Sequence, residues 1–200
     1  EVTASLGISL YPGDGKDEVE LMKNADTAMY RAKESGRNKY EFYSRDMNAR
    51  SLQRLSLESN LRHALERDEF LLHYQPKASL VTREITGFEA LLRWSAGGQK
   101  LVPPGEFVPL LEDTGLIVPV GEWIIEAACR QLGAWRAAGV RMVPIAINLS
   151  ARQFREKNLA AVFERILRSH GVDPRLLEIE ISESFLIPNT DEAVRTLNHL

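Results

Sequence analysis

The chain has 200 residues, of which 44% are hydrophobic, and this is enough apolar material for a buried core. Its formal net charge of −3 argues against a nucleic-acid polymer as partner, because such binders usually carry a basic stripe. Cys129 is the single cysteine, so an internal disulfide is excluded and a reducing, cytoplasmic compartment is favoured.

Apolar spacing and turn residues predict a series of strands and helices in chain order. The first part holds a strand at 2–10, a helix with Met22, Ala25, Met29 and Ala32 on one face, and a strand at 38–43. A charged helix at about 46–67 leads to strands at 70–80 and 84–94. Then come helices at 105–113 and 120–138, a strand at 143–149, a helix at 154–169, a strand at 176–182 and a helix from 191 onward. This alternation predicts the α/β class, with a parallel sheet or barrel. No apolar run approaches the roughly 20 residues of a membrane span, so we expect no membrane contact from this segment.

Three strand-like segments each carry an oxygen-bearing side chain near the C-terminal end. Glu89 lies in the apolar run 87–94, where burial of a carboxylate costs free energy unless a partner is present. Asn148 lies near the end of 145–150, and Glu178 and Glu180 lie in 177–183. Because barrel chemistry gathers at the C-terminal ends of the strands, the segments predict one shared site for a hard metal ion.

Each of these residues also has a structural explanation when taken singly. Glu89 could pair with a distant lysine or arginine, and Asn148 could cap a helix or form a turn. Strand alternation places Glu178 and Glu180 on one face and cannot choose between them. Zinc is disfavoured, since the four histidines are scattered and the cysteine is alone.

Four motifs carry a resemblance to a known family. They are Tyr74-Gln75-Pro76-Lys77, Phe88-Glu89-Ala90-Leu91-Leu92-Arg93-Trp94, Asn148-Leu149-Ser150 and Glu180-Ile181-Ser182-Glu183-Ser184. In this order they resemble the successive signatures of EAL domains, bacterial phosphodiesterases that linearise cyclic di-GMP. The resemblance runs from about Leu57 to Leu200 and implies the first part of a TIM-like (β/α) barrel.

The resemblance also implies roles for individual residues. Glu89, Asn148 and Glu180 would be metal ligands in a two-metal site for Mg²⁺ or Mn²⁺, which resolves the choice between Glu178 and Glu180. Glu183 would act with Glu89 in catalysis, through the loop that orders the site or through the second metal. The dinucleotide would contact three residues: Gln75, Leu91 and Arg93. Further ligands of the family site are expected beyond Leu200.

The first segment resembles a different family. Residues 2–43, including Asn24-Ala25-Asp26-Thr27-Ala28-Met29-Tyr30, resemble the C-terminal end of a GGDEF domain, a cyclase that makes cyclic di-GMP. The acidic hairpin of that family is missing from the sequence, so the resemblance implies no cyclase activity. We therefore expect a GGDEF remnant at 1–43, a helical linker at 44–56 and the N-terminal portion of an EAL domain at 57–200.

The expected function is metal-dependent hydrolysis of cyclic di-GMP to pGpG in bacterial second-messenger signalling. The alternative is a catalytically inactive cyclic di-GMP receptor or regulatory module. The chain starts without Met and stops inside a helical pattern, so we expect a piece of a larger, cytoplasmic signalling protein. The sequence leaves the oligomeric state open, with a homodimer among the alternatives.

Overall fold

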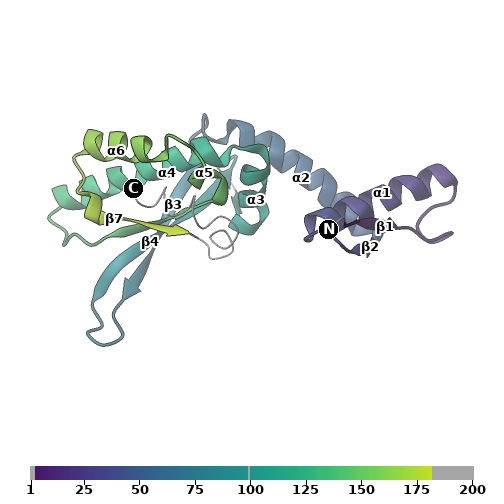
Figure 1. The fold of residues 1–200 in the computed structure, drawn as a ribbon, viewed down its shortest axis with the longest axis horizontal. Coiled ribbons are helices and arrows are strands. Elements are labelled where there is room, and N and C mark those ends of the chain that lie inside the picture. Colours follow the sequence, from purple (N-terminus) through teal and green to yellow (C-terminus); the bar gives the residue numbers. More distant parts are fainter. Residues whose placement is uncertain (1–2, 99, 182–200) are drawn as a thin grey trace. The chain divides into compact units, whose positions relative to one another are not determined.

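A computed structural model describes residues 3–98 and 100–181 of the chain (Figure 1). The chain divides into two compact units, Glu1–Ser59 and Asn60–Leu200, and each is described by itself. None of the helices in the described ranges is long and apolar enough to cross a membrane. The helix expected from 191 onward lies outside the described residues.

The first unit is a helix packed on a small parallel sheet. Strand β1 (Leu6–Ile8) pairs with β2 (Tyr40–Phe42), and helix α1 (Glu18–Glu34) connects them. Asp17 caps the start of α1, because its side chain accepts a hydrogen bond from the backbone N–H of Glu20. The helix approaches β1 so closely that a Cβ atom at Gly7 would lie 1.9 Å from the carbonyl oxygen of Ala25. Helix α2 (Arg45–Ala64) starts in this unit and ends in the second.

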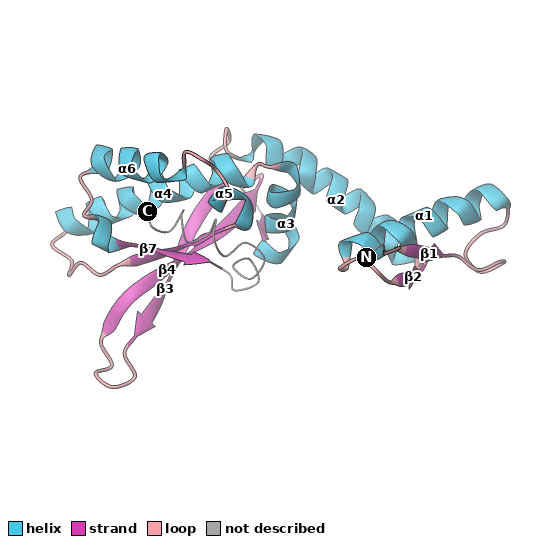
Figure 2. Ribbon diagram, in the orientation of Figure 1, coloured by secondary structure: helices cyan, strands magenta, loops and turns pink. Residues whose placement is uncertain are grey.

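The second unit is an α/β layer structure, drawn by secondary structure in Figure 2. Its elements are β3 (Phe70–Ala78), β4 (Ile85–Ala96), β5 (Lys100–Val102), α3 (Pro104–Thr114), α4 (Ile117–Ala137), β6 (Ile145–Leu149), α5 (Ala151–Phe154), α6 (Leu159–His170), a 3₁₀ turn (Pro174–Leu176) and β7 (Leu177–Ile181). The strand order is β3-β4-β6-β7, and β5 pairs with β4. The β3–β4 and β4–β5 pairs are antiparallel, whereas β4–β6 and β6–β7 are parallel.

The α/β class predicted from the sequence is confirmed, with two differences in the elements. Strand β5 was not predicted, because three residues are too few to show an alternating pattern. The helix predicted at 154–169 starts later, at Leu159 of α6, and the residues before it form a separate short helix, α5, which the capping box of Ser150 and Gln153 starts. The described strands form an open sheet, as expected of part of a TIM-like barrel.

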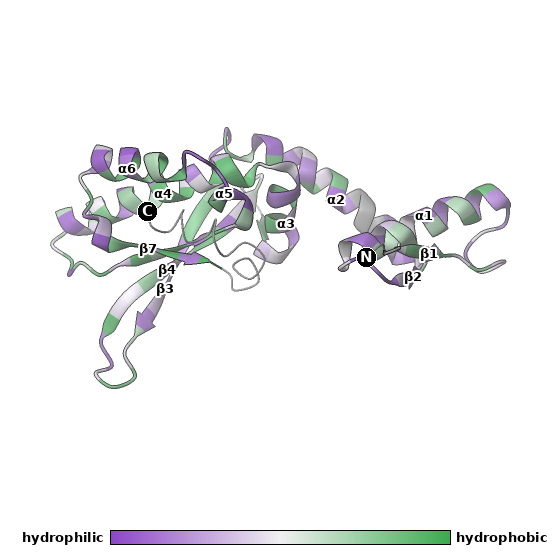
Figure 3. Ribbon diagram, in the orientation of Figure 1, coloured by the Kyte–Doolittle hydropathy of each residue, from purple (hydrophilic) through white to green (hydrophobic). Residues whose placement is uncertain are grey.

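Aromatic side chains join the sheet to the helices on one of its faces. Trp94 is fully buried, and its ring contacts Phe107 of α3 with ring centroids 5.8 Å apart. Trp135 of α4 contacts both Tyr74 of β3 and Phe88 of β4. Helices α4 and α6 lie on this face in Figure 1, and α6 carries both hydrophobic and hydrophilic residues in Figure 3. Because strand side chains alternate, the residues between these aromatics point to the opposite face.

Candidate functional site

Strand register brings the predicted site residues to one face of the sheet. Gln75 of β3 lies opposite Glu89 of β4 in the antiparallel pair. Glu89 is paired in register with Ala146 of the parallel strand β6. Asn148 lies two residues after Ala146 and is paired in register with Glu180 of β7. Four strands therefore deliver polar side chains to one surface, although long stretches of sequence separate them.

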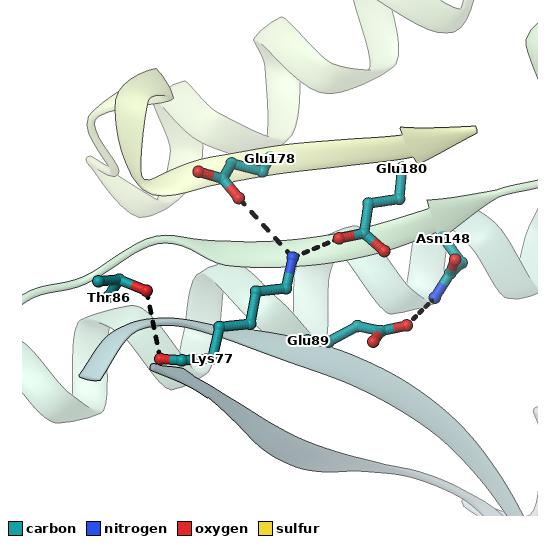
Figure 4. Close-up of polar contacts among 6 residues, drawn as sticks. All are labelled: Lys77, Thr86, Glu89, Asn148, Glu178 and Glu180. Atoms are coloured by element: carbon teal, nitrogen blue, oxygen red, sulfur yellow. Dashed lines mark hydrogen bonds and ion pairs between the residues drawn. The ribbon is translucent and has the colours of Figure 1, made fainter. Parts of the chain in front are cut away.

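Glu89 and Asn148 are in direct contact (Figure 4). The Asn148 amide Nδ2 donates a hydrogen bond of 2.8 Å to the carboxylate Oε1 of Glu89. The expectation that Glu89 is buried is wrong: the side chain is half-buried, because its face of the strand is the one without the aromatic packing. Its apolar sequence neighbours Ala90 and Trp94 are the residues that the helices cover.

Glu180 is bound to a lysine for which the sequence suggested no role. The Lys77 Nζ forms an ion pair and a hydrogen bond with Oε1 of Glu180, and it lies 4.0 Å from Oε2 of Glu178. The hydrogen bond to Glu180 raises the pKa of Lys77. Strand alternation could have placed Lys77 in the site, because it lies two residues after Gln75 on β3.

A cleft of about 780 Å³ opens beside these residues. Arg93 of β4, Asn148 and Glu180 line its polar side, and Val108 and Pro109 of α3 belong to its apolar wall. The Arg93 Nη1 donates to the carbonyl oxygen of Leu92 at 2.9 Å, which directs the guanidinium back along its own strand. Arg155 also lines the cleft, and a cleft with cationic side chains and an apolar wall suits an anionic ligand that also has a flat apolar group.

The predicted site residues differ in whether they line the cleft. Leu91 also lines the cleft, whereas Gln75 and Glu89 lie beside it on the same face of the sheet. Glu112 lies at the cleft, and burial, reinforced by Asp113, raises the pKa of its carboxyl group. Glu183 lies outside the described residues, so its predicted role stays a prediction.

The donor atoms at this surface suit a hard metal ion. Glu89 and Glu180 contribute carboxylate oxygens, and Asn148 contributes an amide oxygen, which are ligands that Mg²⁺ and Mn²⁺ accept. Within the described ranges, no three His, Cys, Asp or Glu residues form a group that could hold a metal ion. The described part of the site is therefore short of carboxylates by itself, and its third candidate ligand is an amide.

Residues 58–200 match the family model described as "EAL domain". The chain belongs to the EAL family. Residues 1–39 match the model described as "Diguanylate cyclase, GGDEF domain", so a GGDEF fragment precedes the EAL domain.

Curated relatives of this EAL protein extend well beyond it. The bifunctional diguanylate cyclase/cyclic di-GMP phosphodiesterase MucR of Pseudomonas aeruginosa is 45% identical over 199 residues, and the match covers 100% of this chain and 29% of MucR. The cyclic di-GMP phosphodiesterase PdeR of Escherichia coli is 37% identical, and the match covers 98% of this chain and 29% of PdeR. The chain thus spans less than a third of either relative.

Solved EAL structures share the fold of the second unit. The PaMucR phosphodiesterase in complex with c-di-GMP is similar with a TM-score of 0.68 and 41% identity, covering 72% of this chain and 58% of that one. The FimX EAL domain of Xanthomonas citri in complex with c-diGMP has a TM-score of 0.66 and 26% identity, covering 76% and 58%. EAL phosphodiesterases are in general dependent on divalent metal ions.

Local packing supports the C-terminal end of β6, where Asn148 lies. The capping box of Ser150 and Gln153 starts α5 directly after β6. Gln153 is buried, and it packs against Gly121 of α4 so closely that a Cβ atom there would lie 1.7 Å from its Nε2. The Arg152 Nη1 donates to the carbonyl oxygen of Glu112 at the end of α3, at 2.9 Å. These contacts link the end of β6 to both helices beside the cleft.

Proposed function

We propose that this protein hydrolyses cyclic di-GMP to the linear dinucleotide pGpG in bacterial second-messenger signalling. The observation that carries the proposal is the convergence of Glu89, Asn148 and Glu180 from three neighbouring strands at the edge of a cleft that Arg93 also lines. The relatives named as cyclic di-GMP phosphodiesterases, and the solved complexes with that dinucleotide, support the same substrate.

The metal would be Mg²⁺ or Mn²⁺ in a two-metal site, held in part by Glu89, Asn148 and Glu180. When bound, such ions acidify water and neutralise the charge that develops on a phosphate. The residues of this chain would hold the ions at the polar side of the cleft, which Asn148 and Glu180 line. Glu183, which lies outside the described residues, would complete this part of the centre.

The substrate contacts follow from the lining of the cleft. Arg93 would bind a phosphate oxygen through its guanidinium, which neutralises an anion without giving up a proton. Leu91 and the apolar wall of α3 would receive part of a guanine base and exclude water from it. Gln75, level with Glu89, would hydrogen-bond to the dinucleotide beside the metal ligands.

The test measures pGpG formation by the whole protein with Mg²⁺ or Mn²⁺, by liquid chromatography. We expect Glu89→Ala to lower the rate at least about 100-fold, because loss of a metal ligand removes electrostatic stabilisation of the transition state. The matched control is Glu84→Ala, which removes an exposed carboxylate directly before the same strand. An unchanged rate in the Glu89 variant would show that the metal assignment is wrong.

The second candidate function is a receptor that binds cyclic di-GMP without turnover. The ion pair of Lys77 with Glu180 favours it, because a lysine already neutralises a predicted metal ligand. The presence of Glu89 favours the enzyme, because this acid is a predicted metal ligand. Binding of cyclic di-GMP without pGpG formation at saturating Mn²⁺ would establish the receptor.

The domain boundaries and cellular setting are also proposals. We propose a GGDEF remnant at 1–43, a helical linker at 44–56 that includes the first part of α2, and an EAL portion at 57–200 of a cytoplasmic signalling protein. The division of the chain after Ser59 is close to the last boundary. Limited proteolysis of the whole protein, with mass spectrometry of the fragments, tests these limits, and ultracentrifugation tests whether it forms a homodimer.

A further inference from the structure

Lys77 lies between two acids of β7, and only one of them is a predicted metal ligand. Its ammonium group contacts Oε1 of Glu180 and lies 4.0 Å from Oε2 of Glu178 (Figure 4). These two acids lie on the same face of β7, because they are two residues apart. The lysine can therefore move from one carboxylate to the other by side-chain rotation alone.

The strand backbone holds Lys77 at this position. The pairing of β3 with β4 is irregular between Lys77 and Ala78, and such bulges redirect side chains. The hydroxyl of Thr86 donates to the carbonyl oxygen of Lys77 at 3.3 Å, from the neighbouring strand. Sheet geometry thus fixes the backbone from which the Lys77 side chain reaches the acids of β7.

An ammonium group and a divalent ion are alternative cations for one carboxylate. Both seek the carboxylate oxygens, and they repel each other at short range. Asn148, which is level with Glu180, and Glu89 complete the oxygen ligands, so a metal bound there would approach the same side chain that Lys77 occupies. Among the residues that the structure describes, Glu178 is the second acid within 4.0 Å of the lysine, so it could receive the ammonium group.

We propose that Lys77 is a positioning residue that competes with the metal for Glu180, and that Glu178 receives its ammonium group when the metal binds. This inference rests on the proposed metal site. It assigns a role to Glu178, whose side chain is 55% exposed and holds no place among the predicted ligands. The lysine would lower metal affinity and keep Glu180 neutralised until the metal arrives.

The competition is measurable as a change in metal affinity. The side chains of Lys77 and Glu180 are 36% and 40% exposed, so solvent screens the pair, and exposed pairs contribute up to about 1 kcal/mol. Removing the lysine charge should therefore lower the Kd for Mn²⁺ about fivefold, which corresponds to about 1 kcal/mol.

The first experiment titrates the whole protein with Mn²⁺ alone and follows unbound Mn²⁺ by electron paramagnetic resonance. We expect Lys77→Met to bind about fivefold more tightly, and Lys77→Arg, which keeps the charge, to bind like wild type. Lys39→Met is the matched control, because Lys39 pairs with Glu41 at a similar exposure of 39% and 30% in the other unit. Equal affinity in the Lys77→Met variant and wild type would overturn the proposal.

The second experiment is a double-mutant cycle with Glu178→Gln. If Glu178 receives the lysine, its loss should weaken Mn²⁺ binding more in wild type than in the Lys77→Met variant, because only in wild type does the ammonium lose its alternative partner. If Glu178→Gln weakens Mn²⁺ binding equally in both backgrounds, Glu178 acts only through its negative charge and does not receive the lysine. This result would overturn its proposed role.

A Glu89→Gln variant separates the metal site itself from the role of Lys77. Glu89→Gln should weaken Mn²⁺ binding whatever Lys77 does. If it does so while Lys77→Met has no effect, the metal site stands and the competition is refuted. If wild type binds no Mn²⁺, the proposed function and this inference fail together.

Discussion

Asn148 and Glu89 are joined by a hydrogen bond of 2.8 Å although they lie 59 positions apart in the chain. The parallel pairing of β4 with β6 brings them together, because Glu89 is level with Ala146 and Asn148 is on the same face two residues later. The amide is the donor, so its oxygen Oδ1 can still coordinate a cation beside the carboxylate. The bond therefore orients two predicted ligands of one site before any ion is present.

We expect Asn148→Asp to make stability strongly dependent on metal. The change removes the donor and places two carboxylates side by side, which lowers the free energy of unfolding by about 1–2 kcal/mol in chelator. Saturating Mn²⁺ should then raise the melting temperature more than in wild type, as calorimetry can show. Asn158→Asp is the control, because it adds the same charge at the start of α6, where a carboxylate is favourable. A metal-induced shift no larger than in wild type would contradict the shared site.

We expect Arg93→Ala to raise the KM for cyclic di-GMP about 10- to 100-fold, because a charge-assisted hydrogen bond to phosphate contributes about 1.5–3 kcal/mol. Initial rates over a range of substrate concentrations give KM and kcat separately. Arg165→Ala, which removes an exposed arginine paired with Glu122 on the helical layer, should leave both constants unchanged. A normal KM in the Arg93 variant would remove this residue from the substrate site.

We expect Gly121→Ala to destabilise the protein by about 1–3 kcal/mol, since overpacking of a filled interior costs this much. The new methyl group would overlap the amide of Gln153 and disturb the capping box that starts α5. Gly133→Ala on the same helix is the matched control: nothing lies within 4 Å of its added Cβ, so it should be neutral or stabilising by up to about 1 kcal/mol. Urea unfolding of both variants measures the difference, and equal midpoints would show that Gln153 can move aside without loss.

We expect Trp94→Phe to lower the free energy of unfolding by about 1.5–3 kcal/mol, the usual contribution of a hydrogen bond to a charged group. The buried indole Nε1 donates at 2.9 Å to Oε2 of Glu69, which is itself only 8% exposed. Trp123→Phe should cost less, because Trp123 is half-buried in the same aromatic cluster. Urea unfolding tests this order, and an equal loss in both variants would mean that the carboxylate of Glu69 finds another donor.

We expect the Cys129 thiol to be inert in the folded protein. The residue is fully buried, and this burial, reinforced by Glu126, raises its pKa from 9.0 to about 11. At pH 8 the thiolate population is then about 100-fold lower than at the ordinary pKa, because each unit is a factor of ten. Labelling with a disulfide reagent should be at least that much slower than in denaturant. Stability should also fall as the pH rises from 9.0 toward 11, because only the unfolded thiol ionises there, and Cys129→Ala should flatten this slope.

Local patterns predicted much of the fold and part of the site. The alternation of Leu177–Ile181 placed Glu178 and Glu180 on one face, and this needs no knowledge of other strands. The apolar spacing that predicted 120–138 reflects one buried helical stripe, which is now seen in α4 from Val120 to Leu132. The short strand β5 and the break between α5 and α6 carried no such period, so the sequence patterns missed them.

The sequence by itself determined which residues share a face of a strand or helix, and its motifs identified the EAL family. Only the tertiary structure decided which distant side chains form contacts. Glu89 contacts Asn148, and Glu180 contacts Lys77, which lies 103 positions earlier in the chain. The physical reason is register, since one strand must be paired with another before residues distant in the chain become neighbours. Burial was likewise a tertiary outcome, because Glu89 lies in an apolar run yet occupies the face that the aromatic core leaves uncovered.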